Sequence, residues 1–324
     1  MAIARTWRSS HHIDGPHPAS VGDIPALNQV FSDSFTERYR RDGMVGVRVP
    51  FLNPAIWRYA IEDANGGALI WRDEREEIIA FNVVHSSGRE GWMGPLAVRP
   101  DGQGSGIGKD IVRAGIDWLK SAGASTIGLE TMPRTMDNIG FYSSLGLVPG
   151  RLTITITVDA ATGDRPPTLL GRLGTRDKED ALEECRSLVA RLIPGHDFTR
   201  ELALTDELSL GDTVLFRASG RLTGFVLCHT APLVEGRARE ETRVLKLVIE
   251  REDDLPAAVR ALADVARRNG TRRVAFRAQT EYVSAYQRLI LMRGRVRWTD
   301  LRMTLADFPE PRAREGIVWS NWEI

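Results

Sequence analysis

The sequence predicts an α+β protein made of two domains that share one order of elements. Its 324 residues are long for one compact domain and suit two domains of about 150 residues each. Hydrophobic residues make up 42% of the chain, which is enough for globular cores. Between two apolar regions, the stretch 159–168 is rich in Asp, Gly and Pro and cannot sustain a helix or strand. We therefore expect domains at 1–158 and 169–324, with 159–168 as the linker.

The first domain reads as a series of strands followed by alternating helices and strands. Aliphatic residues alternate with Thr in the last segment, which is the period of a half-buried strand. Apolar residues recur at three-to-five spacing in the longest helical segment, and Gly123 and Gly146 follow the two helices as end signals. The expected elements are strands 67–72, 78–85 and 92–98, helix 108–122, strand 126–130, helix 137–145 and strand 151–158.

The second domain repeats residues of the first at nearly constant distance. Residues 79–85 match residues 223–229 at an offset of 144, sharing a Phe and a His. Val112-Arg-Ala matches Val259-Arg-Ala at an offset of 147. Small drifts between matches are typical of a duplicated domain whose loops have changed length. The sequence thus indicates an internal duplication.

Composition excludes several classes of function. Lys plus Arg and Asp plus Glu both number 43, so no net charge favours nucleic acid or an anionic membrane as partner. No segment approaches the ~18 apolar residues that span a bilayer, and residues 1–8 lack the apolar core of a signal peptide. Cys185 and Cys228 are too few for a disulfide scaffold or a zinc site. We expect a cytoplasmic protein without a metal.

A glycine-rich turn is the most informative segment. Glycines stand at 102, 104, 106 and 108, after the strand 92–98 and at the start of the helix. Glycine allows positive φ and close approach of a ligand to the backbone. The first amides of a helix have no intrahelical acceptor, and the helix dipole adds positive charge there. The turn and helix together predict a cradle for a pyrophosphate.

Two common nucleotide motifs do not fit this turn. A Walker A loop needs Ser or Thr after Gly108-Lys109, but Asp110 stands there. A dinucleotide fingerprint needs Gly where Ile107 stands, and it expects the first strand of a βαβ series. The pattern that remains is Gln103-x-x-Gly-x-Gly after Val98-Arg-Pro.

This pattern resembles the coenzyme A-binding motif of the GNAT-type N-acetyltransferases. The segments Asn138-Ile-Gly-Phe-Tyr and Leu145-Gly-Leu are similar to the family's next motif, and the resemblance covers about residues 20–158. It implies two GNAT-like domains, each a mixed, mostly antiparallel sheet flanked by helices, arranged as a pseudo-dimer. It also implies acetyl-coenzyme A as cosubstrate.

The resemblance assigns roles to individual positions. The backbone of Leu96, Ala97 and Val98 would pair with the pantetheine arm like an added strand. Asn138 would touch the coenzyme arm, and Tyr142 would lie near the thioester sulfur, where its phenol could protonate the departing thiolate. The pyrophosphate would be held by consecutive amides, those of Gln103, Gly104, Ser105, Gly106, Ile107, Gly108 and Lys109.

The general base stays open at this stage. Many family members carry a Glu on the strand before the turn, but residues 92–98 contain no acid. Glu130, Glu90 and His85 are the nearby candidates, and a chain of water molecules is an equal alternative.

The matching turn of the second domain is unsuited to a pyrophosphate. Residues 250–256 contain four acids and no glycine, and Pro256 removes one amide from the helix start. We expect residues 169–324 to be a degenerate GNAT-like domain without a cofactor site.

Together these features predict an acyltransferase that moves an acetyl group from acetyl-coenzyme A to a small-molecule amine by direct attack in a ternary complex. A protein or peptide N-acetyltransferase and a non-catalytic acyl-coenzyme A sensor are the alternatives. Retention of Tyr142 beside the cradle argues against a sensor, which has no use for a general acid. We expect a monomer with an internal pseudo-dimer, or a weak homodimer.

Overall fold

The computed structural model describes residues 13–163 and 166–322. Residues 1–12 of the predicted first domain, 164–165 of the predicted linker and 323–324 of the predicted second domain lie outside the described residues.

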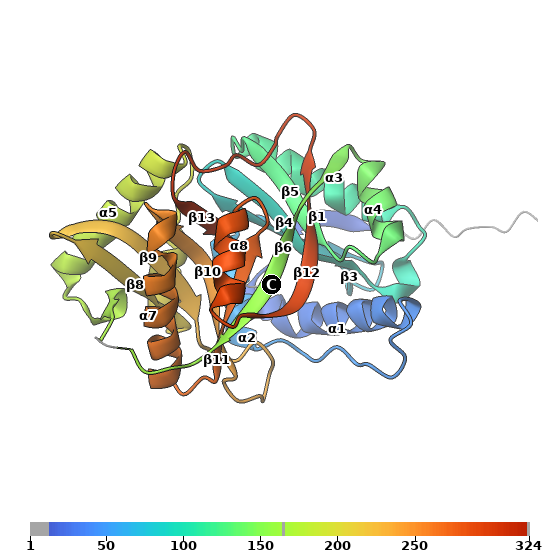
Figure 1. The fold of residues 1–324 in the computed structure, drawn as a ribbon. Coiled ribbons are helices and arrows are strands. Elements are labelled where there is room, and N and C mark those ends of the chain that lie inside the picture. Colours follow the sequence, from blue (N-terminus) through green and yellow to red (C-terminus); the bar gives the residue numbers. More distant parts are fainter. Residues whose placement is uncertain (1–12, 164–165, 323–324) are drawn as a thin grey trace, which may run out of the picture.

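One order of elements occurs twice along the chain and supports the predicted duplication (Figure 1). The first series is β1 (Asp14–Pro18), η1 (Val21–Asp23), α1 (Ile24–Arg41), α2 (Pro54–Asp63), β2 (Ala68–Arg72), β3 (Ile78–Ser87), β4 (Glu90–Val98), η2 (Pro100–Gly102), α3 (Ile107–Ser121), β5 (Thr126–Thr131), α4 (Met136–Ser143) and β6 (Leu147–Asp159). The second is β7 (Thr168–Leu169), η3 (Leu170–Arg172), α5 (Thr175–Leu192), α6 (Thr199–Glu207), β8 (Gly211–Ala218), β9 (Arg221–His229), β10 (Glu241–Ile249), η4 (Glu252–Asp254), α7 (Leu255–Arg268), β11 (Arg273–Gln279), α8 (Val283–Leu291) and β12 (Arg295–Leu305). A final strand, β13 (Ile317–Ser320), has no counterpart in the first series.

The expected elements of the first domain are all present. Most boundaries differ by one to three residues, which is the usual scatter of strand and helix ends. The largest difference is at β6, which begins at Leu147 rather than at residue 151. Residues 148–151 are exposed, so they carry no alternation of apolar and polar side chains that could have marked them as strand.

All strands of the described residues join one 13-stranded sheet. Its order is β1-β2-β3-β4-β5-β12-β6-β11-β10-β9-β8-β7, with β13 paired to β10. The last strand of each series therefore lies in the other half: β12 pairs with β5, and β6 pairs with β11. In Figure 1 the red β12 and the green β6 lie side by side at the centre of the molecule.

Side-chain packing follows this exchange of strands. Met303 of β12 is fully buried in the core of the first half, whereas Ile156 and Val158 of β6 are buried in the core of the second. An isolated half would lose its last strand and expose these apolar groups, so the two halves stabilise each other.

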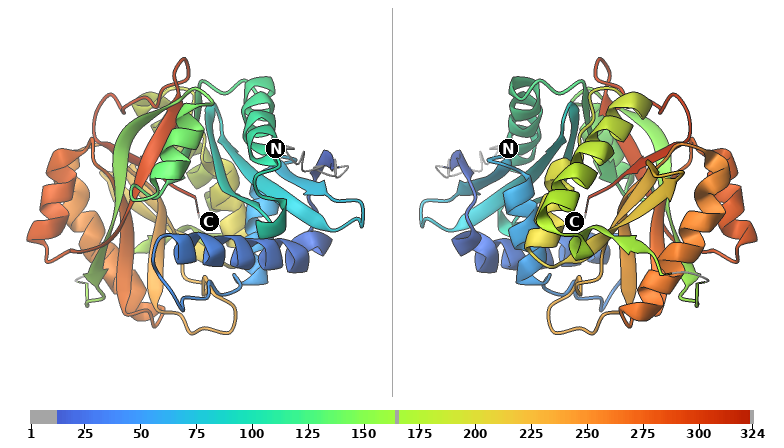
Figure 2. Two further views of the ribbon diagram at one scale, coloured as in Figure 1. Left: turned by 90° about the vertical axis from the view of Figure 1, so that its right-hand side faces the viewer. Right: turned by 90° about the vertical axis from the view of Figure 1, so that its left-hand side faces the viewer.

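Helices cover both faces of the first half of the sheet (Figure 2). The apolar stripe of α3, with Ile111, Val112 and Leu119 fully buried, packs on one face. On the other face α1 and α2 pack against Phe81 and neighbouring residues of β2 and β3. Because both faces are covered, a ligand can enter only where strands diverge. None of the described helices is long and apolar enough to cross a membrane.

Parallel strands diverge once in each half. In the first half, β4 and β5 pair from Glu90 and Thr126 up to Met93 and Leu129. Beyond Met93, β4 continues to Val98 paired with β3 on its other side, and its edge toward β5 is left open. In the second half, β10 and β11 pair only up to Arg243 and Ala275. There β13 pairs antiparallel with β10 along 246–249 and fills the opening.

Candidate functional site

A cavity of about 600 Å³ lies where β4 and β5 diverge. It is bounded by α1, β4, β5 and α4 of the first half and by residues of the second half. Nine of the residues singled out from the sequence line it: His85, Leu96, Ala97, Val98, Gln103, Gly108, Glu130, Asn138 and Tyr142. Of the other six, Glu90 does not line the cavity. The remaining five form the adjoining turn and the start of α3: Gly104, Ser105, Gly106, Ile107 and Lys109.

The turn presents backbone rather than side chains. Gly104 and Gly106 have φ of +80° and +105°, and a Cβ at either position would meet nothing within 4 Å. The Ile107 side chain is buried in the core, and the Gln103 side chain donates from Nε2 to the Val98 carbonyl oxygen at 3.0 Å. The first amides of α3 therefore lie beside open space at the positive end of the helix dipole. Such a site suits a phosphate group.

Tyr142 is a buried residue whose side chain lines the cavity. Burial raises the pKa of its phenol to about 12. The hydroxyl is therefore protonated at neutral pH and can donate to an anion formed in the cavity.

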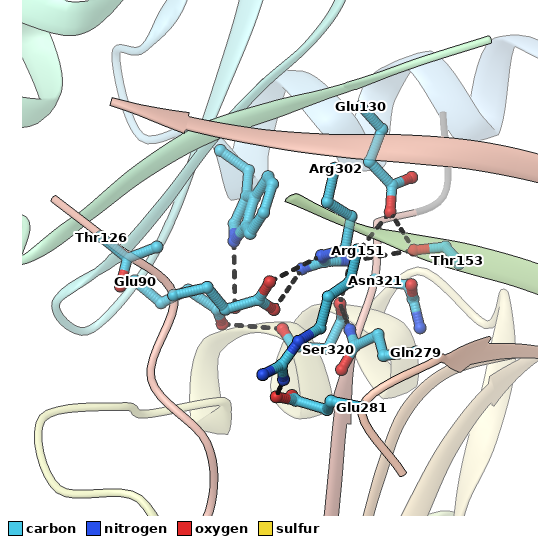
Figure 3. A network of polar contacts seen from close by, with 12 residues as sticks. Glu90, Thr126, Glu130, Arg151, Thr153, Gln279, Glu281, Arg302, Ser320 and Asn321 are labelled. Carbon is cyan, nitrogen blue, oxygen red and sulfur yellow. Dashed lines mark hydrogen bonds and ion pairs between the residues drawn. The ribbon is translucent and has the colours of Figure 1, made fainter. Parts of the chain in front are cut away.

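Glu130 is fully engaged by the protein (Figure 3). It accepts from the Thr153 hydroxyl at 2.5 Å and from Arg302 Nη1 at 2.8 Å, and its second oxygen pairs with Arg277. Burial raises the pKa of this carboxyl, but the charges of Arg277 and Arg302 outweigh burial and leave it lowered. Glu130 is therefore a structural anion and a weak base.

His85 and Glu90 are also occupied. His85 Nε2 donates to the Gly94 carbonyl oxygen at 3.0 Å, and Nδ1 lies 3.1 Å from the carboxylate of Asp63. Glu90 is only 1% exposed and accepts from the Ser320 hydroxyl at 2.7 Å, a contact drawn in Figure 3. Both ring nitrogens of His85 are engaged, and Glu90 does not line the cavity, so the geometry favours structural roles for both.

Comparison with known proteins agrees with this geometry. Residues 25–147 match the model of the acetyltransferase (GNAT) family. This part of the first half is therefore similar to the GNAT acetyltransferase family. No curated protein sequence matches the chain.

Solved structures of known proteins share the fold of this chain over most of its length. An acetyltransferase candidate from Pyrococcus horikoshii covers 99% of this chain and 98% of its own, with a TM-score of 0.67 and 15% identity. A tandem GNAT protein from the clavulanic acid biosynthesis pathway covers 93% of this chain and 100% of its own, with a TM-score of 0.58 and 11% identity. N-myristoyltransferase from Saccharomyces cerevisiae, solved with bound myristoyl-CoA, covers 96% of this chain and 87% of its own, with a TM-score of 0.60 and 11% identity. These likenesses confirm the predicted fold class of two GNAT-like domains.

Residues of the second half complete the cavity, and sequence reasoning missed these residues. Arg277 of β11, Trp298 and Asp300 of β12, and Trp322 after β13 all line it. They reach the cavity because β12 pairs with β5 and β13 enters beside β10. No local motif marks these positions, since the exchange of strands is a property of the whole sheet. Trp322 lies against His85 and Trp92 at the cavity.

The described residues contain no group of three or more His, Cys, Asp or Glu placed to hold a metal ion. The residues present do fit a coenzyme A molecule. The glycine turn leaves room for phosphate oxygens. The edge of β4 that β5 leaves open after Met93 offers backbone groups to an extended arm.

Proposed function

We propose that the protein transfers an acetyl group from acetyl-coenzyme A to the amine of a small molecule, by direct attack in a ternary complex. The observation that carries this proposal is the opening between β4 and β5, which begins after Met93 and runs into the glycine turn. The amides of 103–109 would hold the pyrophosphate. Leu96, Ala97 and Val98 would bind the pantetheine arm along the free edge of β4, and Asn138 would contact the same arm.

Within this arrangement the protein positions the two reactants and donates one proton. The amine attacks the thioester carbonyl, and the carbon–sulfur bond breaks as the amide forms. The Tyr142 hydroxyl donates to the departing thiolate, which it can do because burial keeps it protonated.

Two further proposals concern the setting of the reaction. The free, buried thiols of Cys185 and Cys228 are consistent with a reducing compartment, and we place the protein in the cytoplasm. The internal pairing of two halves supports a monomer, because the contacts that a second subunit would supply are made within the chain.

The test has two stages. Calorimetry with coenzyme A should give one binding site per chain, and thiol release from acetyl-coenzyme A should then require a small amine from a panel of amines, amino acids and peptides. Binding without thiol release for any acceptor would instead support a sensor. Acetylation of peptides alone would support a protein N-acetyltransferase.

A further inference from the structure

At one end of the cavity, charged side chains from β5, β11 and β12 come together. Arg277 Nη2 pairs with Glu130 and lies 3.3 Å from Asp300 Oδ2, so two carboxylates share one guanidinium. Behind them the buried Arg302 donates from Nη1 to Glu130 at 2.8 Å and from Nε to Glu310 at 3.0 Å. Two carboxylates of the cavity lining, Glu130 and Asp300, thus share Arg277, while Arg302 and Glu310 lie behind them.

Asp300 is the least satisfied of these carboxylates. Glu130 has three donors, as described above. Asp300 accepts one neutral hydrogen bond, from Trp298 Nε1 to Oδ1 at 3.0 Å. Its contact with Arg277 is longer than the 2.7–2.9 Å usual for a charge-assisted bond. Because an ionised carboxylate can accept about four hydrogen bonds, Asp300 retains acceptor capacity toward the cavity that it lines.

We propose that Asp300 binds the ammonium group of the acceptor and takes one proton from it, so that the acceptor is a primary amine that is cationic in solution. This rests on the proposed acetyl transfer. Aromatic rings of Phe35, Trp298 and Trp322 line the same cavity and suit an apolar or aromatic body next to that amine.

The proton balance closes with two groups of the chain. One ammonium proton passes to Asp300 and leaves for solvent after the reaction. The neutral amine forms the new nitrogen–carbon bond, and the thiolate receives its proton from Tyr142, which is restored by the second nitrogen proton. The second half thereby supplies the base, and the first half supplies the acid.

The charged and titratable groups around Asp300 set its behaviour with pH. They are Arg277 on β11, Glu130 on β5 and Tyr39 on α1, and Arg134 lies over the Trp298 ring at 5.0 Å. Burial raises the pKa of Asp300, Arg277 lowers it and Glu130 raises it, with a net rise above the ordinary 3.8. The basic form is lost as pH falls through this raised pKa, so the acid limb of kcat/KM should lie above that of an ordinary Asp.

Two probe amines separate a role in proton transfer from a structural one. Benzylamine is cationic at pH 7, whereas aniline is neutral there and has no ammonium proton to lose. Asp300→Asn keeps the size of the side chain and an acceptor for Trp298. We expect it to lower kcat/KM for benzylamine by ~10² or more and for aniline by less than ~10-fold, and to remove the acid limb.

Controls keep this test distinct from that of the proposed function. Asp307→Asn, at an exposed position just after β12, should leave both rates unchanged, and coenzyme A affinity should be unchanged in both variants. An equal loss for benzylamine and aniline, or a retained acid limb, would overturn the role of Asp300. Thiol release by the wild-type protein with alcohols or thiols but with neither amine would overturn it as well. Absence of coenzyme A binding in the wild-type protein would instead defeat the proposed function.

Discussion

The strands β4 and β5 diverge around a cavity, whereas the corresponding strands β10 and β11 diverge around a strand of the chain itself. In the first half the free edge of β4 begins after Met93. In the second, residues 246–249 of β10 pair with residues 317–320 of β13. Asn321 then donates from its side chain to the Arg277 carbonyl oxygen of β11 at 3.1 Å.

This difference shows how one duplicated fold serves two purposes. Backbone groups at the edge of a divergent strand need partners when they are buried. In the second half β13 supplies these partners, and we propose that this half therefore gains stability and binds no ligand there. In the first half an exchangeable ligand can supply them. The sequence had pointed only to the acidic turn of the second half, and the structure adds a second obstacle in β13.

The largest effect is expected from closing the first opening at its turn. Gly106→Glu places a side chain and a negative charge where the pyrophosphate would lie, at a φ of +105° that suits glycine. Calorimetry should show a stoichiometry that falls from one to zero. Gly220→Glu is the matched control, because Gly220 has a φ of +80° and equally open surroundings far from the cavity. Residual binding in a folded Gly106→Glu protein would contradict the assignment of this turn.

The second prediction concerns the filled opening. Trp319 of β13 is fully buried and packs against Phe276 with ring centroids 6.5 Å apart. Trp319→Ala should lower the free energy of unfolding by ~3–5 kcal/mol, measured by urea denaturation, whereas Val296→Ala at an exposed position should change it by less than ~0.5 kcal/mol. For comparison, filling the other opening with coenzyme A at 100 times its Kd should add ~2.7 kcal/mol. A small loss in Trp319→Ala would mean that β13 is only loosely held.

A third prediction compares the tyrosines of α4 and α8. Tyr142→Phe should lower turnover by on the order of 10²-fold with little change in coenzyme A affinity, because the hydroxyl acts in the transition state. Tyr286 lies on α8, the helix of the second series that corresponds to α4, and packs against the core of the second half. Tyr286→Phe should leave turnover unchanged. Wild-type turnover in Tyr142→Phe would reduce Tyr142 to a packing residue.

The last prediction is that removing the acidic residues of the second turn will not change the stoichiometry of coenzyme A binding. Replacing Glu252, Asp253 and Asp254 together by glycine removes the charges that oppose a pyrophosphate. The stoichiometry should nevertheless stay at one, since β13 still occupies the edge of β10. A value of two would show that charge alone keeps coenzyme A out of the second half.

Local patterns in the sequence were sufficient for much of this account. The alternation of residues 151–158 and the amphipathic stripe of α3 predicted their elements, because strand and helix periods are short-range properties. The duplication was visible in residues 79–85 and 223–229, which became β3 and β9. The glycine turn was visible because positive φ and close ligand approach both require glycine. The roles of Asn138 and Tyr142, the domain boundaries at 158 and 169, and the acetyl donor stay predictions.

Tertiary structure alone decided which half each last strand joins and what fills each opening. The exchange of β6 and β12 depends on pairings between residues more than a hundred positions apart, such as Leu301 with Thr131. The insertion of β13 depends on pairings such as Ile249 with Ile317, which are also far apart in the sequence. Backbone pairing carries no side-chain code that a single sequence displays over such distances. The same reason hid Asp300 and Arg277, which reach the cavity only through those pairings, while Glu130 and His85 were found by proximity and proved to be held by the protein. Local sequence patterns therefore determined the glycine turn, whereas the long-range strand order determined which residues of the second half line the cavity.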